Sequence, residues 1–126
     1  MNLPLQLSFR DIHKTQDLED FIRSKTEKLE RICDHISSCR VSVEQPQKHI
    51  KSGSPYRVRI DLTVTPAHEL VSKREPGQGN IHEDLRTVIK DVFKGAENQL
   101  HSLVEKQRKE VKTHKRREVE NVEPNE

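Results

Sequence analysis

Large aromatic side chains are scarce in this chain of 126 residues, which has no tryptophan, one tyrosine and three phenylalanines. Hydrophobic residues make up 30% of the sequence and charged residues 35%, so a core must be built economically from aliphatic side chains. No run approaches the roughly 18 consecutive apolar residues of a membrane-spanning helix, so we expect no membrane contact. The N-terminus has no basic segment followed by an apolar one, so we also expect no secretory signal.

Motifs for catalysis and metal binding are also missing. Cys33 and Cys39 form neither a C-x-x-C pair nor a metal-binding spacing, so we expect two reduced, half-buried thiols in a cytoplasmic protein. The seven histidines are scattered without an H-E-x-x-H motif or a Cys/His cluster, which predicts no metal site. The glycine-containing segment 76–80 lacks the lysine and third glycine of phosphate-binding loops and is interpreted as a flexible connector. We therefore predict no enzyme activity, no cofactor and no small-molecule substrate.

Polarity patterns predict six elements in the order β-α-β-β-β-α. Alternating polarity predicts strands over residues 3–10, 39–44, 56–65 and 69–75. Helical spacing of apolar residues predicts helices over residues 16–36 and 82–112. Each strand has one apolar face and each helix one apolar stripe. We therefore expect an α+β fold in which both helices pack on one face of a four-stranded, largely antiparallel sheet.

The C-terminal end of the chain is polar and highly charged. Residues 113–126 lack the apolar surface needed to offset the entropy of ordering. The sequence therefore predicts one domain over residues 1–112 and a disordered charged tail over residues 113–126.

Basic side chains stand beside the apolar stripe of the first predicted helix. They are Arg23, Lys25, Lys28 and Arg31. Their spacing lets much of this charge share one side of the helix, which suits a phosphate backbone. The same segment, residues 16–36, also holds six acidic residues, so a merely solvated helix face is the alternative interpretation.

Positive charge is in excess in the predicted sheet and its loops. Residues 40–74 hold seven basic and three acidic side chains, whereas residues 82–112 hold seven and six. Arg57 and Arg59 alternate with the apolar residues of the third strand and should lie on its polar face. Such a patch would attract a polyanion. Exposed strands also carry basic residues as protection against edge pairing, so both interpretations stay open.

The chain resembles a known protein family. The element order and one motif in the first helix carry the likeness: Leu18-x-x-Phe21-Ile22-x-x-Lys25-x-x-Lys28-Leu29-Glu30, followed by Asp34 and Ile36. This pattern is similar to the short ribosome hibernation proteins, the group of the hibernation promoting factor and ribosome-associated inhibitor A (protein Y), also called the sigma-54 modulation family. The likeness covers roughly residues 3–110.

The resemblance implies a double-stranded-RNA-binding-like fold and a partner, the rRNA of the small ribosomal subunit. Family members occupy the mRNA and tRNA channel and block initiation in starved cells, and we expect a monomer off the ribosome. Lys25 and Lys28 match basic positions of the family. With neighbouring and sheet residues they give the candidate rRNA-binding set: Arg23, Lys25, Lys28, Arg31, Arg57, Arg59, Arg86, Lys90 and Lys94. The second helix departs from the family, because several of its basic positions fall here on Gly95, Asn98 and Ser102.

Two main hypotheses follow. A ribosome-binding inhibitor of the hibernation type predicts that basic residues of the first helix and of the third strand form one contiguous exposed region. A protein-interaction module that kept the fold and lost the ribosome predicts that Glu27, Glu30 and Asp61 neutralise those charges, and that binding uses the open sheet face. A double-stranded-RNA-binding domain acting away from ribosomes is a third possibility.

Overall fold

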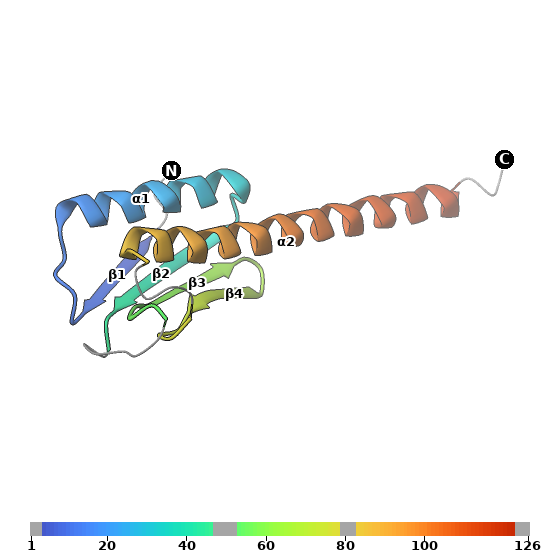
Figure 1. Cartoon of the computed structure of the whole chain (residues 1–126). Coiled ribbons are helices and arrows are strands. Elements are labelled where there is room, and N and C mark those ends of the chain that lie inside the picture. Colours follow the sequence, from blue (N-terminus) through green and yellow to red (C-terminus); the bar gives the residue numbers. More distant parts are fainter. Residues whose placement is uncertain (1–3, 47–52, 79–82, 123–126) are drawn as a thin grey trace.

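The computed structural model describes residues 4–46, 53–78 and 83–122, with side chains described as far as Lys109 (Figure 1). Its elements are β1 (Leu5–Arg10), α1 (Gln16–Ile32), β2 (Ile36–Glu44), β3 (Arg57–Val64), β4 (His68–Arg74) and α2 (Leu85–Val122). The predicted order β-α-β-β-β-α is confirmed.

The sheet has the spatial order β1-β2-β3-β4. β1 is parallel to β2, and the β2–β3 and β3–β4 pairs are antiparallel. Parallel neighbours need a crossover connection, which α1 supplies between β1 and β2. Both helices lie on the same face of the sheet and run in the same direction (Figure 1). The predicted α+β arrangement is therefore confirmed.

α1 begins at a well-formed cap. Thr15 has an extended backbone, and its hydroxyl accepts a hydrogen bond from the backbone N–H of Leu18 at 3.1 Å. Acidic side chains in the first turn favour the positive end of the helix dipole. The helix ends at Ile32 and not at Ile36 as predicted, because Cys33 is extended and Ile36 already begins β2. Ile36 is buried from the strand, so its apolar character fitted either element.

α2 extends to Val122, ten residues beyond its predicted end at residue 112. The structure therefore has helix over residues 113–122, where the sequence predicts a disordered tail, and residues 123–126 lie outside the described part of the chain. The division into a domain over residues 1–112 and a tail over residues 113–126 stays a prediction. The sequence holds neither glycine nor proline between Gly95 and Pro124 and is rich in Glu, Lys and Arg, which favour helix even without a core to pack on.

The first half of segment 76–80, interpreted from the sequence as a flexible connector, is held by backbone hydrogen bonds. The N–H of Gly77 donates to the carbonyl of Ser54 at 2.8 Å, and the N–H of Ser54 donates to the carbonyl of Gln78 at 3.0 Å. These bonds hold the chain after β4 against the chain before β3. Residues 79–80, and residues 47–52 of the preceding loop, lie outside the described part.

The core fills the space between the helices and the inner face of the sheet. The central strands contribute every second residue: Val41, Val43, Val58, Ile60, Leu62 and Val64. Phe93 of α2 is the largest fully buried side chain. The side chains that alternate with these strand residues point to the opposite sheet face, which no helix covers (Figure 1).

Both cysteine thiols lie in this core and not half-exposed as predicted, since 4% of Cys33 and 1% of Cys39 is exposed. Burial raises the pKa of the Cys39 thiol from 9.0 to about 11, because the thiolate would lose its hydration.

The raised pKa of Cys39 predicts a loss of stability in alkali. Between pH 9 and pH 11 the unfolded chain releases this proton while the folded chain keeps it, so the free energy of unfolding falls as pH rises. A shift of two pKa units corresponds to about 2–3 kcal/mol. Urea unfolding of wild type and Cys39→Ala measures the effect. The difference between their free energies of unfolding should decrease by this amount from pH 9 to pH 11. A difference that stays constant in alkali would contradict the prediction.

Candidate nucleic-acid interface

Two cations meet at one aromatic ring where α1 and α2 contact each other. The Lys25 ammonium lies 5.6 Å from the ring centroid of Phe21, one helical turn away on α1. The Arg86 guanidinium, from the first turn of α2, lies 4.9 Å from the same centroid. Cation–π attraction holds both charges at the seam between the helices without neutralising them, because the ring carries no net charge.

A second contact crosses the same seam further along. The Lys28 ammonium lies 3.6 Å from a carboxylate oxygen of Glu97 on α2. Only 8% of the Glu97 side chain is exposed, against 55% of that of Lys28. A buried carboxylate needs a partner, so Lys28 is held in place by Glu97 while much of its side chain remains in water.

Two further basic residues in the first part of α2 continue this surface. Lys90 lies one turn after Arg86 and Lys94 one turn later, and both are exposed. Neither forms an ion pair within the described part of the chain. We define the helix-seam surface as Lys25, Lys28, Arg86 and Lys90, with Lys94 beside it.

The other two basic residues of α1 differ from these. Arg23 lies about 200° around the helix from Phe21, at about 100° per residue, and so faces away from α2. Its guanidinium binds Glu19 at 3.1 Å, and Arg23 and Lys14 together hold the pKa of that carboxyl below its ordinary value. Arg31 is exposed in the last turn of α1 and forms no ion pair among the described residues.

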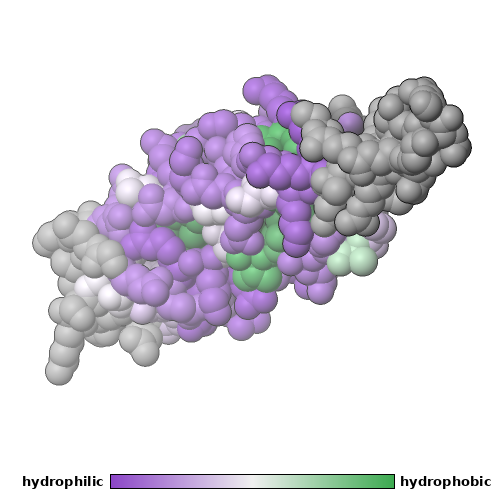
Figure 2. Space-filling view, turned by 90° about the vertical axis from the view of Figure 1, so that its right-hand side faces the viewer, coloured by the Kyte–Doolittle hydropathy of each residue, from purple (hydrophilic) through white to green (hydrophobic). Residues whose placement is uncertain are grey.

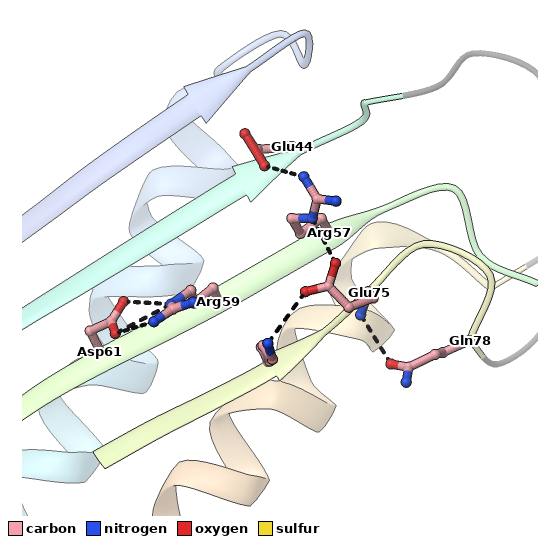
Figure 3. Close-up of polar contacts among 7 residues, drawn as sticks. Glu44, Arg57, Arg59, Asp61, Glu75 and Gln78 are labelled. Atoms are coloured by element: carbon pink, nitrogen blue, oxygen red, sulfur yellow. Dashed lines mark hydrogen bonds and ion pairs between the residues drawn. The ribbon is translucent and has the colours of Figure 1, made fainter. Parts of the chain in front are cut away.

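On the open sheet face, Arg57 and Arg59 are paired with carboxylates (Figure 3). The Arg57 guanidinium donates to Glu75 at 2.9 Å and to Glu44 at 3.2 Å, and these bonds raise its pKa. Arg59 donates to both carboxylate oxygens of Asp61, the shorter bond being 3.0 Å. The positive charge inferred from the sequence is therefore largely compensated on this face.

Two further contacts extend this compensation across the sheet. Arg10 of β1 lies 3.7 Å from Glu44, and Lys73 of β4 lies 3.8 Å from Glu75. A hollow of about 210 Å³ on the same face is lined by residues of both signs, among them Arg40, Asp61 and Glu69, which does not favour an anion.

The expectation of one contiguous positive region is wrong. Lys25 and Lys28 belong to α1 in the helix layer, whereas Arg57 and Arg59 belong to β3 and lie on the sheet face opposite the helices (Figure 3). The rival expectation of neutralisation holds for Arg59, which binds Asp61, but the described partner of Lys28 is Glu97 and not Glu27 or Glu30. The structure thus separates the seam cations Lys25, Arg86 and Lys90, which have no ion-pair partner among the described residues, from the paired Arg57 and Arg59 of the sheet face; Lys28 belongs to the seam but is paired with Glu97.

Residues 5–108 match a family model described as sigma 54 modulation protein / S30EA ribosomal protein. The chain belongs to this family. The resemblance drawn from the sequence is thereby confirmed, and the family is one of ribosome-binding modulation factors and not of enzymes. A comparison with curated proteins found no match.

Solved structures show the same fold. The Thermus thermophilus Protein Y N-terminal domain is 20% identical with a TM-score of 0.61, covering 82% of this chain and 99% of that one. A ribosomal subunit interface protein from Coxiella burnetii is 17% identical with a TM-score of 0.59, covering 80% of this chain and 97% of that one.

Two other kinds of site are absent from the described residues. No helix in residues 4–46, 53–78 and 83–122 has the length and apolar character to cross a bilayer. Among the side chains described in residues 4–46, 53–78 and 83–109, no group of three or more His, Cys, Asp or Glu is arranged to hold a metal ion.

Two residues of the seam were missed by sequence reasoning as parts of a site. Phe21 was named only as part of the family motif, yet it is partly buried and its ring contacts two cations. Its spacing of four residues from Lys25 was a usable signal, because such residues meet on a helix. Glu97 gave no such signal, since its contact with Lys28 depends on how the two helices pack.

Proposed function

We propose that this protein is a translation inhibitor that binds small-subunit rRNA through the helix-seam surface and blocks initiation by occupying the mRNA and tRNA channel. The observation that carries the proposal is the group of uncompensated cations around Phe21. Membership of a family of ribosome-binding modulation factors supports the ribosome as the partner. Inhibition of this kind needs no chemistry, only occupancy of a site that translation requires.

The seam suits RNA phosphates for electrostatic reasons. Arg86 can donate two parallel hydrogen bonds to one phosphate, whereas Lys25 and Lys28 supply point charges. The cation–π contacts and the Glu97 pair reduce the freedom of these side chains before RNA arrives, so less entropy is lost on binding. Binding should weaken with salt, because each phosphate contact releases counterions.

A protein-interaction module is the second candidate function. The observation in its favour is the open sheet face, where Arg57, Arg59 and their carboxylate partners form a surface of mixed charge without a covering layer (Figure 3). Such a surface would bind a protein of complementary charge pattern rather than a polyanion.

Co-sedimentation with purified ribosomal subunits tests the proposal. We expect saturable, near-stoichiometric binding to small subunits at low salt, weaker binding at moderate salt, and competition with initiator tRNA. Large subunits are the matched control and should bind less. Light scattering of the protein alone should report a monomer, as we also propose. Failure to bind small subunits even at low salt would contradict the ribosome-binding proposal and favour the sheet-face module.

A further inference from the structure

The last part of α2 projects beyond the domain (Figure 1). Leu103 and Val104 are the last apolar side chains of the helix described as packed against the core, whereas the helix backbone continues to Val122. At a rise of about 1.5 Å per residue, residues 105–122 add about 27 Å of helix. We call residues 106–117 of this extension the arm.

The arm is strongly basic in sequence. Residues 106–117 hold seven lysines and arginines and one glutamate, whereas the preceding part of α2, residues 85–105, holds three basic and three acidic residues. The family match ends at residue 108, so most of the arm lies beyond the segment shared with that family. Membership of the family therefore does not account for the positive charge of the arm.

The described start of the arm presents basic side chains to solvent. Lys106, Arg108 and Lys109 are exposed, and Lys109 lies 3.9 Å from Glu105, one turn earlier. Three positive charges within four residues therefore stand against one described carboxylate partner. Phosphate groups neutralise such charges and gain entropy by releasing counterions.

The surface near this end offers little to an apolar partner. Figure 2, which views the molecule from the right-hand side of Figure 1, shows a largely hydrophilic surface with small hydrophobic patches. Arg108 and Lys109 are exposed in the described part of the arm. The arm also continues the helix that carries Arg86 and Lys90, so RNA bound at the seam could extend along it.

We propose that the arm is a second RNA-binding element, which contacts rRNA phosphates outside the footprint of the helix-seam surface. This inference rests on the proposed function, because it takes the same rRNA as partner. The arm would then contribute the part of the binding affinity that depends most on salt concentration. α2 would carry two separate sets of phosphate contacts, one at the seam and one on the arm.

Charge removal in the full-length protein tests the arm. In the test variant, four basic residues become glutamine, a good helix former: Lys112→Gln, Lys115→Gln, Arg116→Gln and Arg117→Gln. We expect affinity for small subunits to fall by about 10- to 100-fold near 0.1 M salt. The slope of log K against log salt should become shallower by about 3–4 if all four residues contact phosphates, at roughly 0.7–0.9 per lost contact. The control variant Glu118→Gln/Glu120→Gln should keep the wild-type slope.

The outcomes separate this inference from the proposed function. If wild type binds small subunits and the test variant binds with the same affinity and slope, the arm proposal is overturned while the seam proposal stands. If the test variant loses affinity for subunits but keeps wild-type affinity for deproteinised small-subunit rRNA, the arm contacts ribosomal protein and the proposal is overturned. If wild type itself fails to bind subunits, the proposed function is overturned first.

Discussion

The double substitution Lys25→Glu/Arg86→Glu is expected to lower affinity for the small ribosomal subunit by about two to four orders of magnitude. Each residue supplies a cation at the Phe21 ring, Arg86 exposed and Lys25 half-buried, and a hydrogen bond to a charged group contributes about 1.5–3 kcal/mol. Losing two such contacts therefore costs about 3–6 kcal/mol, and repulsion between glutamate and phosphate adds to it. Quantitative co-sedimentation at fixed salt measures the effect.

A matched charge reversal on the sheet face provides the control. Arg59→Glu/Lys73→Glu changes the net charge by the same amount but removes cations that are already paired with Asp61 and Glu75. We expect this variant to bind within a few-fold of wild type, since only long-range attraction changes. Equal weakening by the two double variants would mean that total charge, and not the helix seam, determines binding.

Lys28 matches a basic position of the family, as Lys25 does, but its contact with Glu97 makes it unsuited to charge reversal. A glutamate at position 28 would stand beside the buried carboxylate of Glu97, and removing one partner of a buried pair is destabilising. Thermal unfolding should confirm that Lys25→Glu/Arg86→Glu remains folded, because exposed cation–π contacts contribute only about 0.5–1 kcal/mol each.

The fold was predictable because its signals are local. The alternation of polarity in β3 determines which residues face the core. Its four apolar residues are buried as expected: Val58, Ile60, Leu62 and Val64. The ends of elements were less predictable. The spacing of apolar residues did not reveal that Ile36 belongs to a strand and not to the first helix. The apolar stripe of α2 ends near Val104, but the helix itself continues to Val122.

The site was only half predictable because charge compensation depends on tertiary pairing. The Arg59–Asp61 pair lies within one strand, where residues two apart share a face, so it could be read from the sequence. The bonds from Arg57 to Glu44 and Glu75 depend on the register of β3 with both neighbours. Sequence reasoning therefore placed the basic residues on the correct elements but could not separate free cations from paired ones.

The substitution Gly95→Ala is expected to destabilise the protein, although alanine is the better helix former. A Cβ atom at position 95 would lie 2.6 Å from the hydroxyl oxygen of Ser72 on β4. That hydroxyl donates to the carbonyl of Val92 at 2.7 Å, so it cannot move away without losing a hydrogen bond between sheet and helix. Overpacking costs about 1–3 kcal/mol and the bond about 0.5–1.5, against a propensity gain of about 1 kcal/mol. These ranges give a net loss of about 0.5–3.5 kcal/mol, and we expect about 1–2 kcal/mol.

Removing the hydroxyl should reverse the sign of this effect. In a Ser72→Ala background, the nearest described side-chain atom to the new Cβ is the Cβ of residue 72, at 3.7 Å, which is an ordinary van der Waals distance. In that background Gly95→Ala should therefore stabilise the protein by about 1 kcal/mol, the gain in helix propensity. Urea unfolding of the wild type, both single variants and the double variant gives the coupling, which we expect to be about 2–3 kcal/mol. If Gly95→Ala instead stabilises both backgrounds equally, the close approach of α2 to β4 does not explain the glycine. A large coupling would show that this glycine lets the helix pack closely on β4, which in turn positions Arg86 and Lys90 at the seam.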